Sequence, residues 1–262
     1  MKLYNPIIEK GRDLTAADRE LIVSPAHDKP GRSAALLWES LFEIEGVYVP
    51  QSVYRFFKQT EPFSNINFLE SIPEHHSAFD NLGKGRMHDL LIQAQWEEEK
   101  IIIAVEAKVD EPFDNQTIKE YRTTGEATLT SGKNSNKPAR ISKLIKAIFP
   151  EWQHSEVENL KYQLLQATAG TLAEAKTRNA AKAIFCVLNF KPMEPGLDYS
   201  TKNALNSKNM DDFFRAFTNV ATQQMATNQL HGPFYVPGDA DIPSDIPLYF
   251  LKLEQVFNSP KN

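Results

Sequence analysis

The stretch that decides the fold runs from Asp89 to Lys108 and reads DLLIQAQWEEEKIIIAVEAK. Its apolar segments, 89–95 and 101–109, are separated by the polar residues 96–100. Apolar runs of this length on either side of a short polar connector are typical of paired strands. The pattern therefore predicts a β-hairpin.

Three side chains of this hairpin, Asp89, Glu106 and Lys108, are the candidates for chemistry. In an antiparallel hairpin the numbers of paired residues have a constant sum; for Asp89 and Glu106 it is 195, which centres the turn between Glu97 and Glu98. Directly opposite residues, and residues two apart on one strand, share a face of the sheet. We therefore expect the three side chains to converge on one patch.

The tripeptide Glu-x-Lys alone is uninformative, because it occurs at 98–100, 106–108 and 174–176. The first copy falls in the predicted turn. The third falls in a predicted helix, where residues two apart point in different directions. Only 106–108 lies at the end of an apolar strand, so only this copy is predicted to present both side chains to one site.

Two carboxylates held close together repel unless a cation or a proton lies between them. Two oxygen ligands with open water positions suit Mg²⁺ or Mn²⁺, which also bind substrate phosphates. A lysine alongside can orient or deprotonate a water and offset charge in a transition state. The alternative is an ion pair at a strand end, with Asp89 simply beginning the strand.

The rest of the chain predicts an α/β fold. A strand, then helices, then a buried strand at 181–190 implies a parallel crossover. The stretch 50–63 is ambiguous, and 130–138 reads as a mobile loop. We expect helices at 13–22, from Ser33 to near Gly46, and at 118–122, 141–149, 157–178 and 210–220, and further strands at 65–71 and 248–253.

Length and composition narrow the class of protein. The 262 residues, 41% hydrophobic and 24% charged, are ordinary for a globular protein and exclude disordered and fibrous classes. The single cysteine, Cys186, cannot form an intramolecular disulfide, which fits a reducing cytosol. The longest apolar run, 183–188, is shorter than the roughly 20 residues that span a bilayer. Since residues 1–6 also lack a secretory signal, we expect a cytoplasmic protein without a membrane partner.

Charge is unevenly distributed along the chain. The net charge is −5, yet 115–182 carries eleven Lys and Arg against six Glu and no Asp. This basic middle could follow a nucleic-acid backbone. The alternative, which the charge pattern favours, is that these residues form the solvated faces of helices.

The residues around the hairpin resemble the PD-(D/E)XK nuclease superfamily. Asp89, a 16-residue gap and then Glu106-Ala107-Lys108 on an apolar strand match its signature. A helix before a three-stranded meander, then a helix and a parallel strand, matches its order of elements. The segments 31–39 (GRSAALLWE), 105–114 (VEAKVDEPFD) and 162–165 (YQLL) are similar to an uncharacterised bacterial branch.

This resemblance, over about 31–190, implies a restriction-endonuclease-like core with a central mixed sheet flanked by helices. It implies metal ligation by Asp89 and Glu106, with Lys108 on the attacking water. Glu39 matches a helix glutamate that serves as a further ligand in some members, and Gln163 matches a polar helix residue near the site. Two departures are that Met87-His88 replaces the motif's proline, and that Ala167 stands where exonuclease-like members carry tyrosine.

Several other residues have two readings. Glu111 and Asp114 could support a metal from behind its ligands, although solvated loop acids are favoured. His75-His76 reads as a surface pair, and His88 could orient Asp89. The segment 83–86 lacks the phosphate-loop pattern and is either a basic lip near the site or an ordinary turn.

We therefore expect one domain, 1–262, with a nuclease-like core at about 31–190 and an extension at 191–262. The first hypothesis is a Mg²⁺- or Mn²⁺-dependent nuclease that acts on DNA or RNA. The second is a silent module of the same fold that binds nucleic acid or a protein through the basic stretch 133–146. The sequence leaves the substrate polymer open, and also whether the chain forms a homo-oligomer.

Overall fold

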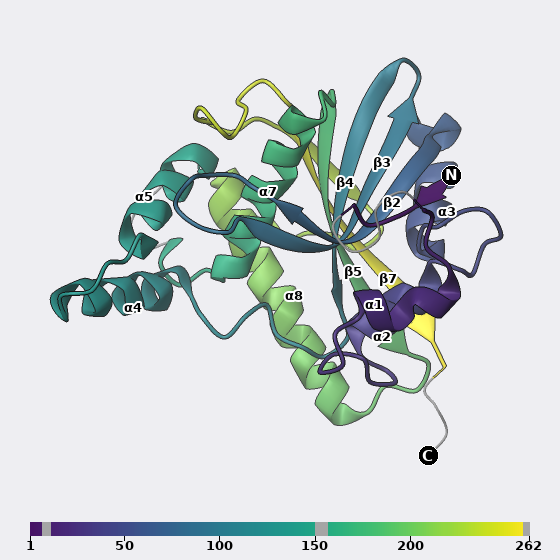
Figure 1. Ribbon diagram of the computed structural model, residues 1–262, viewed down its shortest axis with the longest axis horizontal. Coiled ribbons are helices and arrows are strands. Elements are labelled where there is room, and N and C mark those ends of the chain that lie inside the picture. Colours follow the sequence, from purple (N-terminus) through teal and green to yellow (C-terminus); the bar gives the residue numbers. More distant parts are fainter. Residues whose placement is uncertain (7–11, 150–156, 259–262) are drawn as a thin grey trace.

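The structure is a computed structural model that describes residues 1–6, 12–149 and 157–258. Among these residues one seven-stranded mixed sheet has the order β1-β2-β3-β4-β5-β7-β6 (Figure 1). Its strands are β1 (Lys2–Leu3), β2 (Asn67–Ser77), β3 (Arg86–Trp96), β4 (Glu99–Lys108), β5 (Lys182–Pro192), β6 (Leu230–Phe234) and β7 (Leu248–Phe257). The helices are α1 (Arg19–Ile22), α2 (Ser33–Ser40), α3 (Gln51–Gln59), α4 (Ile118–Thr130), α5 (Lys137–Ile148), α7 (Tyr162–Thr177) and α8 (Leu197–Thr218).

The predicted hairpin is confirmed in its register. β3 and β4 pair antiparallel from Leu90 opposite Val105 to Trp96 opposite Glu99, so that every pair sums to 195. The turn begins at Glu97, whose φ is 53°. A positive φ at this position is typical of two-residue hairpin turns, because it matches the twist of the flanking strands.

The parallel crossover is also confirmed. β5 runs parallel to β4, with Ile101 opposite Lys182 and Lys108 opposite Asn189. The described part of the connection contains α4, α5 and α7. The face of α7 that meets the sheet is rich in alanine together with Gly170, and small side chains let the helix backbone approach the strands closely.

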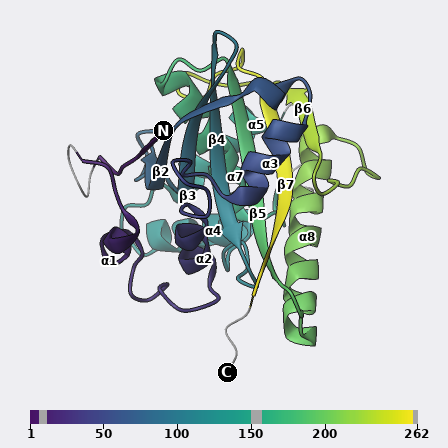
Figure 2. The same cartoon turned by 90° about the vertical axis from the view of Figure 1, so that its right-hand side faces the viewer.

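Two apolar cores lie on opposite faces of the sheet. One is formed under α5, α7 and α8 and includes Leu91, Ile102 and Phe185. The other lies under α2 and α3 and includes Ile92, Ile103 and Cys186. Figures 1 and 2 show the two sets of helices on either side of the strands. Buried on both faces, β4 reads as a continuous apolar run rather than an alternating one.

The segment after residue 190 adds two strands to this same sheet. β7 pairs in parallel with β5, from Ala183 opposite Leu248 to Pro192 opposite Phe257, and β6 pairs antiparallel with β7. Helix α8 begins 13 residues before the predicted start at Met210. The reason is that its first turns bury little apolar surface, as Leu197 shows with 85% exposure.

Other boundaries differ from prediction for local reasons. β2 continues through Pro73 to Ser77, although proline is unusual within a strand. The ambiguous stretch 50–63 contains α3. Ser33 is the first residue of α2 rather than its cap. None of the described helices is both long and apolar enough to span a membrane.

Candidate metal and catalytic site

The candidate site lies where β3 and β4 part. Their ladder ends at the pair Leu90 and Val105. One residue further, the Asp89 carboxylate accepts a hydrogen bond of 2.7 Å from the backbone N–H of Ala107. A side chain therefore replaces a backbone acceptor at this point, and the contact fixes Asp89 against the strand that carries Glu106.

Glu106 is the electrostatic centre of the site, with a side chain only 1% exposed. Lys108 Nζ lies 2.8 Å from its Oε1, Gln163 Nε2 of α7 donates to the same oxygen, and Arg86 Nη2 donates to Oε2. Burial alone would raise the pKa of this carboxyl, but Arg86 and Lys108 outweigh burial and hold the pKa at about 2. Glu106 is therefore a charged carboxylate held by two cations and an amide.

Lys108 is an ammonium in this setting. Burial lowers its pKa, but the charges of Glu106 and Asp89 outweigh that effect and raise the pKa above its ordinary value. A protonated lysine can offset negative charge on a reacting group, whereas it cannot accept a proton from water. Of the two roles considered for Lys108, its charge state favours the electrostatic one.

A third acid, Glu74, faces the same site and was not predicted. It lies between the pairs Pro73–Leu90 and His75–His88, and so opposite Asp89, with a φ of 50°. Burial raises the pKa of Glu74 to about 8 and that of Asp89 to about 7, and in each case neighbouring carboxylates add to the effect. Two acids here thus lack the compensation that Glu106 receives.

The signal for Glu74 was weak in the sequence. The predicted strand, 65–71, stops before Pro73, so Glu74 falls outside it. A positive φ at a residue other than glycine is rarely visible in sequence. Only the β2–β3 register, known once β2 is known to continue, places Glu74 opposite Asp89.

The candidate residues differ in whether they reach one cavity. A cavity of about 590 Å³ is lined by Asp89, Glu106, Lys108 and Gln163, together with Glu74 and Arg86. Glu39 does not line it. Its side chain is 56% exposed and pairs with Arg19 at 2.8 Å, because its position on α2 turns it away from the strand ends.

Two histidines near the site, His88 and His75, have surroundings that differ from those expected. His88 is fully buried against Gly170, and its ring nitrogens lack hydrogen-bond partners among the described residues, so it does not orient Asp89. Burial lowers the pKa of His88 to about 3. His75 is not a surface residue, since its side chain is 12% exposed and Nε2 lies 2.9 Å from Glu174.

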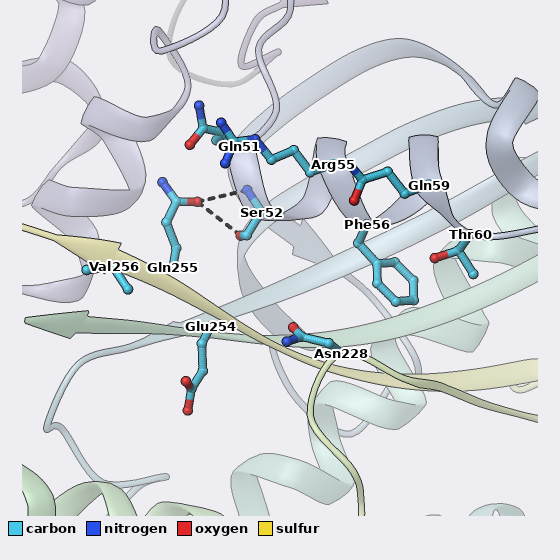
Figure 3. Close-up of a pocket in the computed structure, with 10 residues that line it drawn as sticks. All are labelled: Gln51, Ser52, Arg55, Phe56, Gln59, Thr60, Asn228, Glu254, Gln255 and Val256. Atoms are coloured by element: carbon cyan, nitrogen blue, oxygen red, sulfur yellow. Dashed lines mark hydrogen bonds between the residues drawn. The ribbon is translucent and has the colours of Figure 1, made fainter. Parts of the chain in front are cut away.

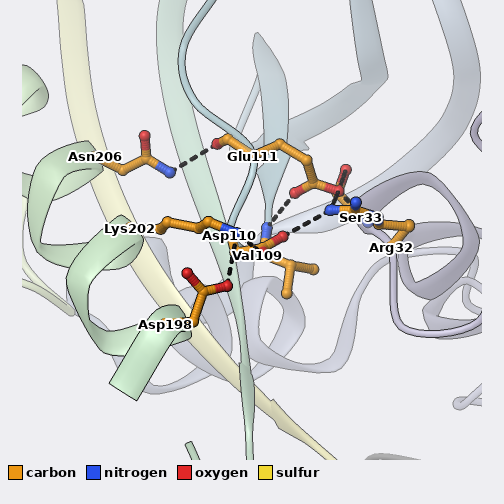
Figure 4. Close-up of polar contacts among 8 residues, drawn as sticks. All are labelled: Arg32, Ser33, Val109, Asp110, Glu111, Asp198, Lys202 and Asn206. Carbon is orange, nitrogen blue, oxygen red and sulfur yellow. Dashed lines mark hydrogen bonds and ion pairs between the residues drawn. The ribbon is translucent and has the colours of Figure 1, made fainter. Parts of the chain in front are cut away.

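Asp110 and Glu111, which follow Lys108, line the same cavity and connect it to neighbouring helices (Figure 4). Glu111 accepts hydrogen bonds from Ser33 N–H and Oγ at 3.1 and 3.2 Å and from Val109 N–H at 2.8 Å. Asp110 pairs with Arg32 at 2.7 Å and with Lys202 of α8 at 3.0 Å. These contacts tie α2 and α8 to the end of β4.

Asp114 and the segment 83–86 differ in whether they reach the cavity. Asp114 is exposed and accepts a hydrogen bond from the N–H of Asn115, which agrees with a loop acid. Of the segment 83–86, Arg86 enters the cavity as the first residue of β3. Part of this segment is therefore a basic lip of the site.

The donor set of the cavity suits a hard divalent cation. Glu74, Asp89 and Glu106 offer carboxylate oxygens, which Mg²⁺ and Mn²⁺ prefer. In the conformation described, no three His, Cys, Asp or Glu side chains among the described residues already surround a metal position. The contact of Arg86 with Glu106 is the feature that a metal on Glu106 would have to replace.

A second cavity, of about 610 Å³, lies on the other face of the sheet, between α3 and β7 (Figure 3). Ser52 and Gln255 meet across it, with Oγ 3.0 Å from Oε1. Arg55 and Glu254 also line it, without a second carboxylate or a lysine. It therefore lacks the paired acids of the first cavity.

The basic stretch 133–146 is largely engaged within the molecule. Arg140 pairs with Asp80 at 2.8 Å and is buried. Lys143 pairs with Asp241. Lys137 lies over the ring of Tyr121 at 4.5 Å. These partners reduce the positive charge that the stretch could offer to a nucleic acid.

No curated protein and no solved structure matches this chain. One family model does match it, over residues 13–256, and its description is "Domain of unknown function (DUF6946)". The matched range contains every residue of the cavity named above. Since it covers nearly the whole chain, the protein belongs to the DUF6946 family.

Proposed function

We propose that this protein is a divalent-metal-dependent nuclease with a restriction-endonuclease-like core. The observation that carries the proposal is that Asp89, Glu106 and Lys108 line one cavity at the open end of a hairpin. The order of elements supports it. A helix precedes the β2-β3-β4 meander, and α7 leads into the parallel strand β5, as in the PD-(D/E)XK superfamily that the sequence resembles.

Asp89 and Glu106 would hold Mg²⁺ or Mn²⁺, and Glu74 lines the same cavity. When bound, the ion would polarise a phosphodiester and lower the pKa of an attacking water. The raised pKa values of Asp89 and Glu74 support this assignment, because burial and neighbouring carboxylates outweigh the nearby cations at both acids.

The remaining side chains have electrostatic and positioning roles. The Lys108 ammonium, only 8% exposed as a residue, would offset charge that develops on the phosphate. Gln163 would position Glu106 by donating to its Oε1. Because Gln163 comes from α7 and Lys108 from β4, the crossover connection is what assembles the site.

Cleavage by matched variants tests this proposal. The protein would be incubated with a mixture of single- and double-stranded DNA and RNA in Mg²⁺ or Mn²⁺, and the products resolved on a gel. Wild type should cleave at least one polymer, and Asp89→Asn should not. Glu99→Gln is the control, because Glu99 lies on the paired strand β4, at the exposed turn end of the hairpin.

One observation favours a second candidate, a module of this fold that binds without cleaving. Glu106 already has three donors, and a carboxylate so satisfied needs no metal. Nucleic-acid binding that weakens steeply with salt, without cleavage in either metal, would favour this alternative. Cleavage that requires Asp89 would exclude it.

A further inference from the structure

Arg86 occupies a prepared position inside the cavity. It is the first residue of β3, and Gly85 before it has a φ of 82°, which places the chain tightly against Ser77 of β2. On the other side Gly170 of α7 leaves room, since a Cβ there would lie 3.2 Å from the Cβ of Arg86. The two glycines let the side chain enter the site, where it is 16% exposed.

The resting contact uses only part of what Arg86 can donate. A guanidinium carries five N–H donors in a planar fork. Nη2 donates to Glu106 Oε2. Nε is buried and has no partner among the described residues. A buried donor left unpaired is costly, so the position is better suited to a ligand with several acceptor oxygens.

Two other cations that line the cavity, Arg32 and Lys202, have different partners, whereas Lys108 shares Glu106 with Arg86. Arg32 pairs with Asp110, and Lys202 pairs with Asp110 and Asp198. Asp110 also lines the cavity, but the proposed function gives it no metal. The partner of Arg86 is instead Glu106, a carboxylate to which the proposed function gives a metal.

We propose, on the basis of that function, that Arg86 is the substrate-phosphate ligand and that Glu106 stores it in the metal-free protein. Glu106 Oε2 cannot bind a guanidinium and a divalent cation at the same time without a cost, because the two positive charges repel. Once released, the fork of Arg86 can donate two parallel hydrogen bonds to phosphodiester oxygens. The same residue thus competes with the metal and assists the substrate.

Two titrations on the whole chain test this inference. The first measures Mn²⁺ affinity by calorimetry, without nucleic acid, for wild type, Arg86→Gln, Arg86→Lys and Arg178→Gln. Arg86→Gln removes the competing charge and should bind Mn²⁺ at least about tenfold more tightly. Arg86→Lys keeps the charge and should bind like wild type. Arg178→Gln is the control, because Arg178 is a partly buried arginine that pairs with Glu174 and does not line the cavity.

The second titration measures, by fluorescence anisotropy, the binding of a phosphorothioate-protected oligonucleotide in saturating Mn²⁺. Arg86→Gln and Arg86→Lys should both bind it about tenfold more weakly than wild type, since lysine lacks the fork. Circular dichroism would establish that each variant is folded, and Arg86→Lys, which keeps a partner for Glu106, serves if Arg86→Gln does not fold.

The inference is overturned if Arg86→Gln binds Mn²⁺ no more tightly than wild type, or if neither protein binds it. It is also overturned if both Arg86 variants hold the oligonucleotide as tightly as wild type. Failure of the nuclease proposal has a different signature. In that case wild type cleaves nothing, while Arg86→Gln still gains Mn²⁺ affinity.

Discussion

The two ends of the β3–β4 hairpin carry the same tripeptide in opposite surroundings. At the turn, Glu98 and Lys100 are exposed. At the open end, Glu106 and Lys108 are 1% and 8% exposed, and α7 and β3 supply partners for the acid. The chemical role of a Glu-x-Lys pair therefore depends on its burial and on the helices and strands that converge on it, rather than on the tripeptide itself.

The largest expected effect is the difference in stability between substitutions at Glu106 and at Glu98. Glu106→Ala should lower the free energy of unfolding by roughly 3–5 kcal/mol, because it leaves Arg86 and Lys108 buried without a counter-charge. Glu98→Ala should change it by less than about 0.5 kcal/mol. Urea denaturation measures both. Equal losses of stability at the two positions would contradict the difference in burial and partners between Glu106 and Glu98.

The next effect separates the two lysines by activity. Lys108→Met should reduce turnover by roughly 10²–10³-fold if its ammonium stabilises the transition state. Lys100→Met, an exposed residue of the same strand, should cleave like wild type. Initial rates at saturating nucleic acid and metal give the ratio, and full activity of Lys108→Met would remove this residue from the mechanism.

The third Glu-x-Lys copy, 174–176, adds a test in which the free energy of unfolding depends on pH. Burial raises the pKa of Glu174, but His75 and Arg178 outweigh it and hold the pKa at about 2. Because this lies below the value in the unfolded chain, the stabilisation is present above about pH 4.5 and is lost as the pH falls toward 2.

Wild type should therefore exceed Glu174→Gln in stability at pH 6 by on the order of 2 kcal/mol. The difference should shrink by pH 3. Urea denaturation at both pH values measures it, with the exposed Glu126→Gln as the control. A difference that grows toward acid would show that the sign is wrong.

The smallest effect concerns the brace behind the open end. Ser33→Ala removes the hydroxyl that donates to Glu111 at 3.2 Å but leaves the backbone N–H in place. We expect a loss of about 1 kcal/mol in the free energy of unfolding. Ser142→Ala, whose exposed hydroxyl only returns to its own helix, should lose less. A reversed order would show that the brace does not stabilise the site.

The same contrast explains how far sequence reasoning reaches. The hairpin register, the crossover and the convergence of Asp89 with Glu106 follow from local pattern and strand geometry, and the structure agrees with all three. Glu74 depends on a strand that continues past a proline, so pattern alone did not identify it. The segment 83–86 was open between a basic lip and an ordinary turn, and only the structure shows that Arg86 contacts Glu106.

Glu39 shows the opposite limit. Glu39 was expected at the site only by resemblance, yet it does not line the cavity and its side chain is 56% exposed. The pair with Arg19 belongs to the outer side of that helix. Gln163, matched in the same way, does reach Glu106, because α7 packs directly on β4.

The nuclease proposal depends on Asp89 and Glu106 together holding a divalent cation. Calorimetric titration of Mn²⁺ into wild type and Asp89→Asn tests it most directly, since the substitution keeps the shape and removes one charge. We predict one binding event in wild type that Asp89→Asn loses or weakens by at least about tenfold. Equal affinity in the two proteins, or no binding by wild type, would contradict it.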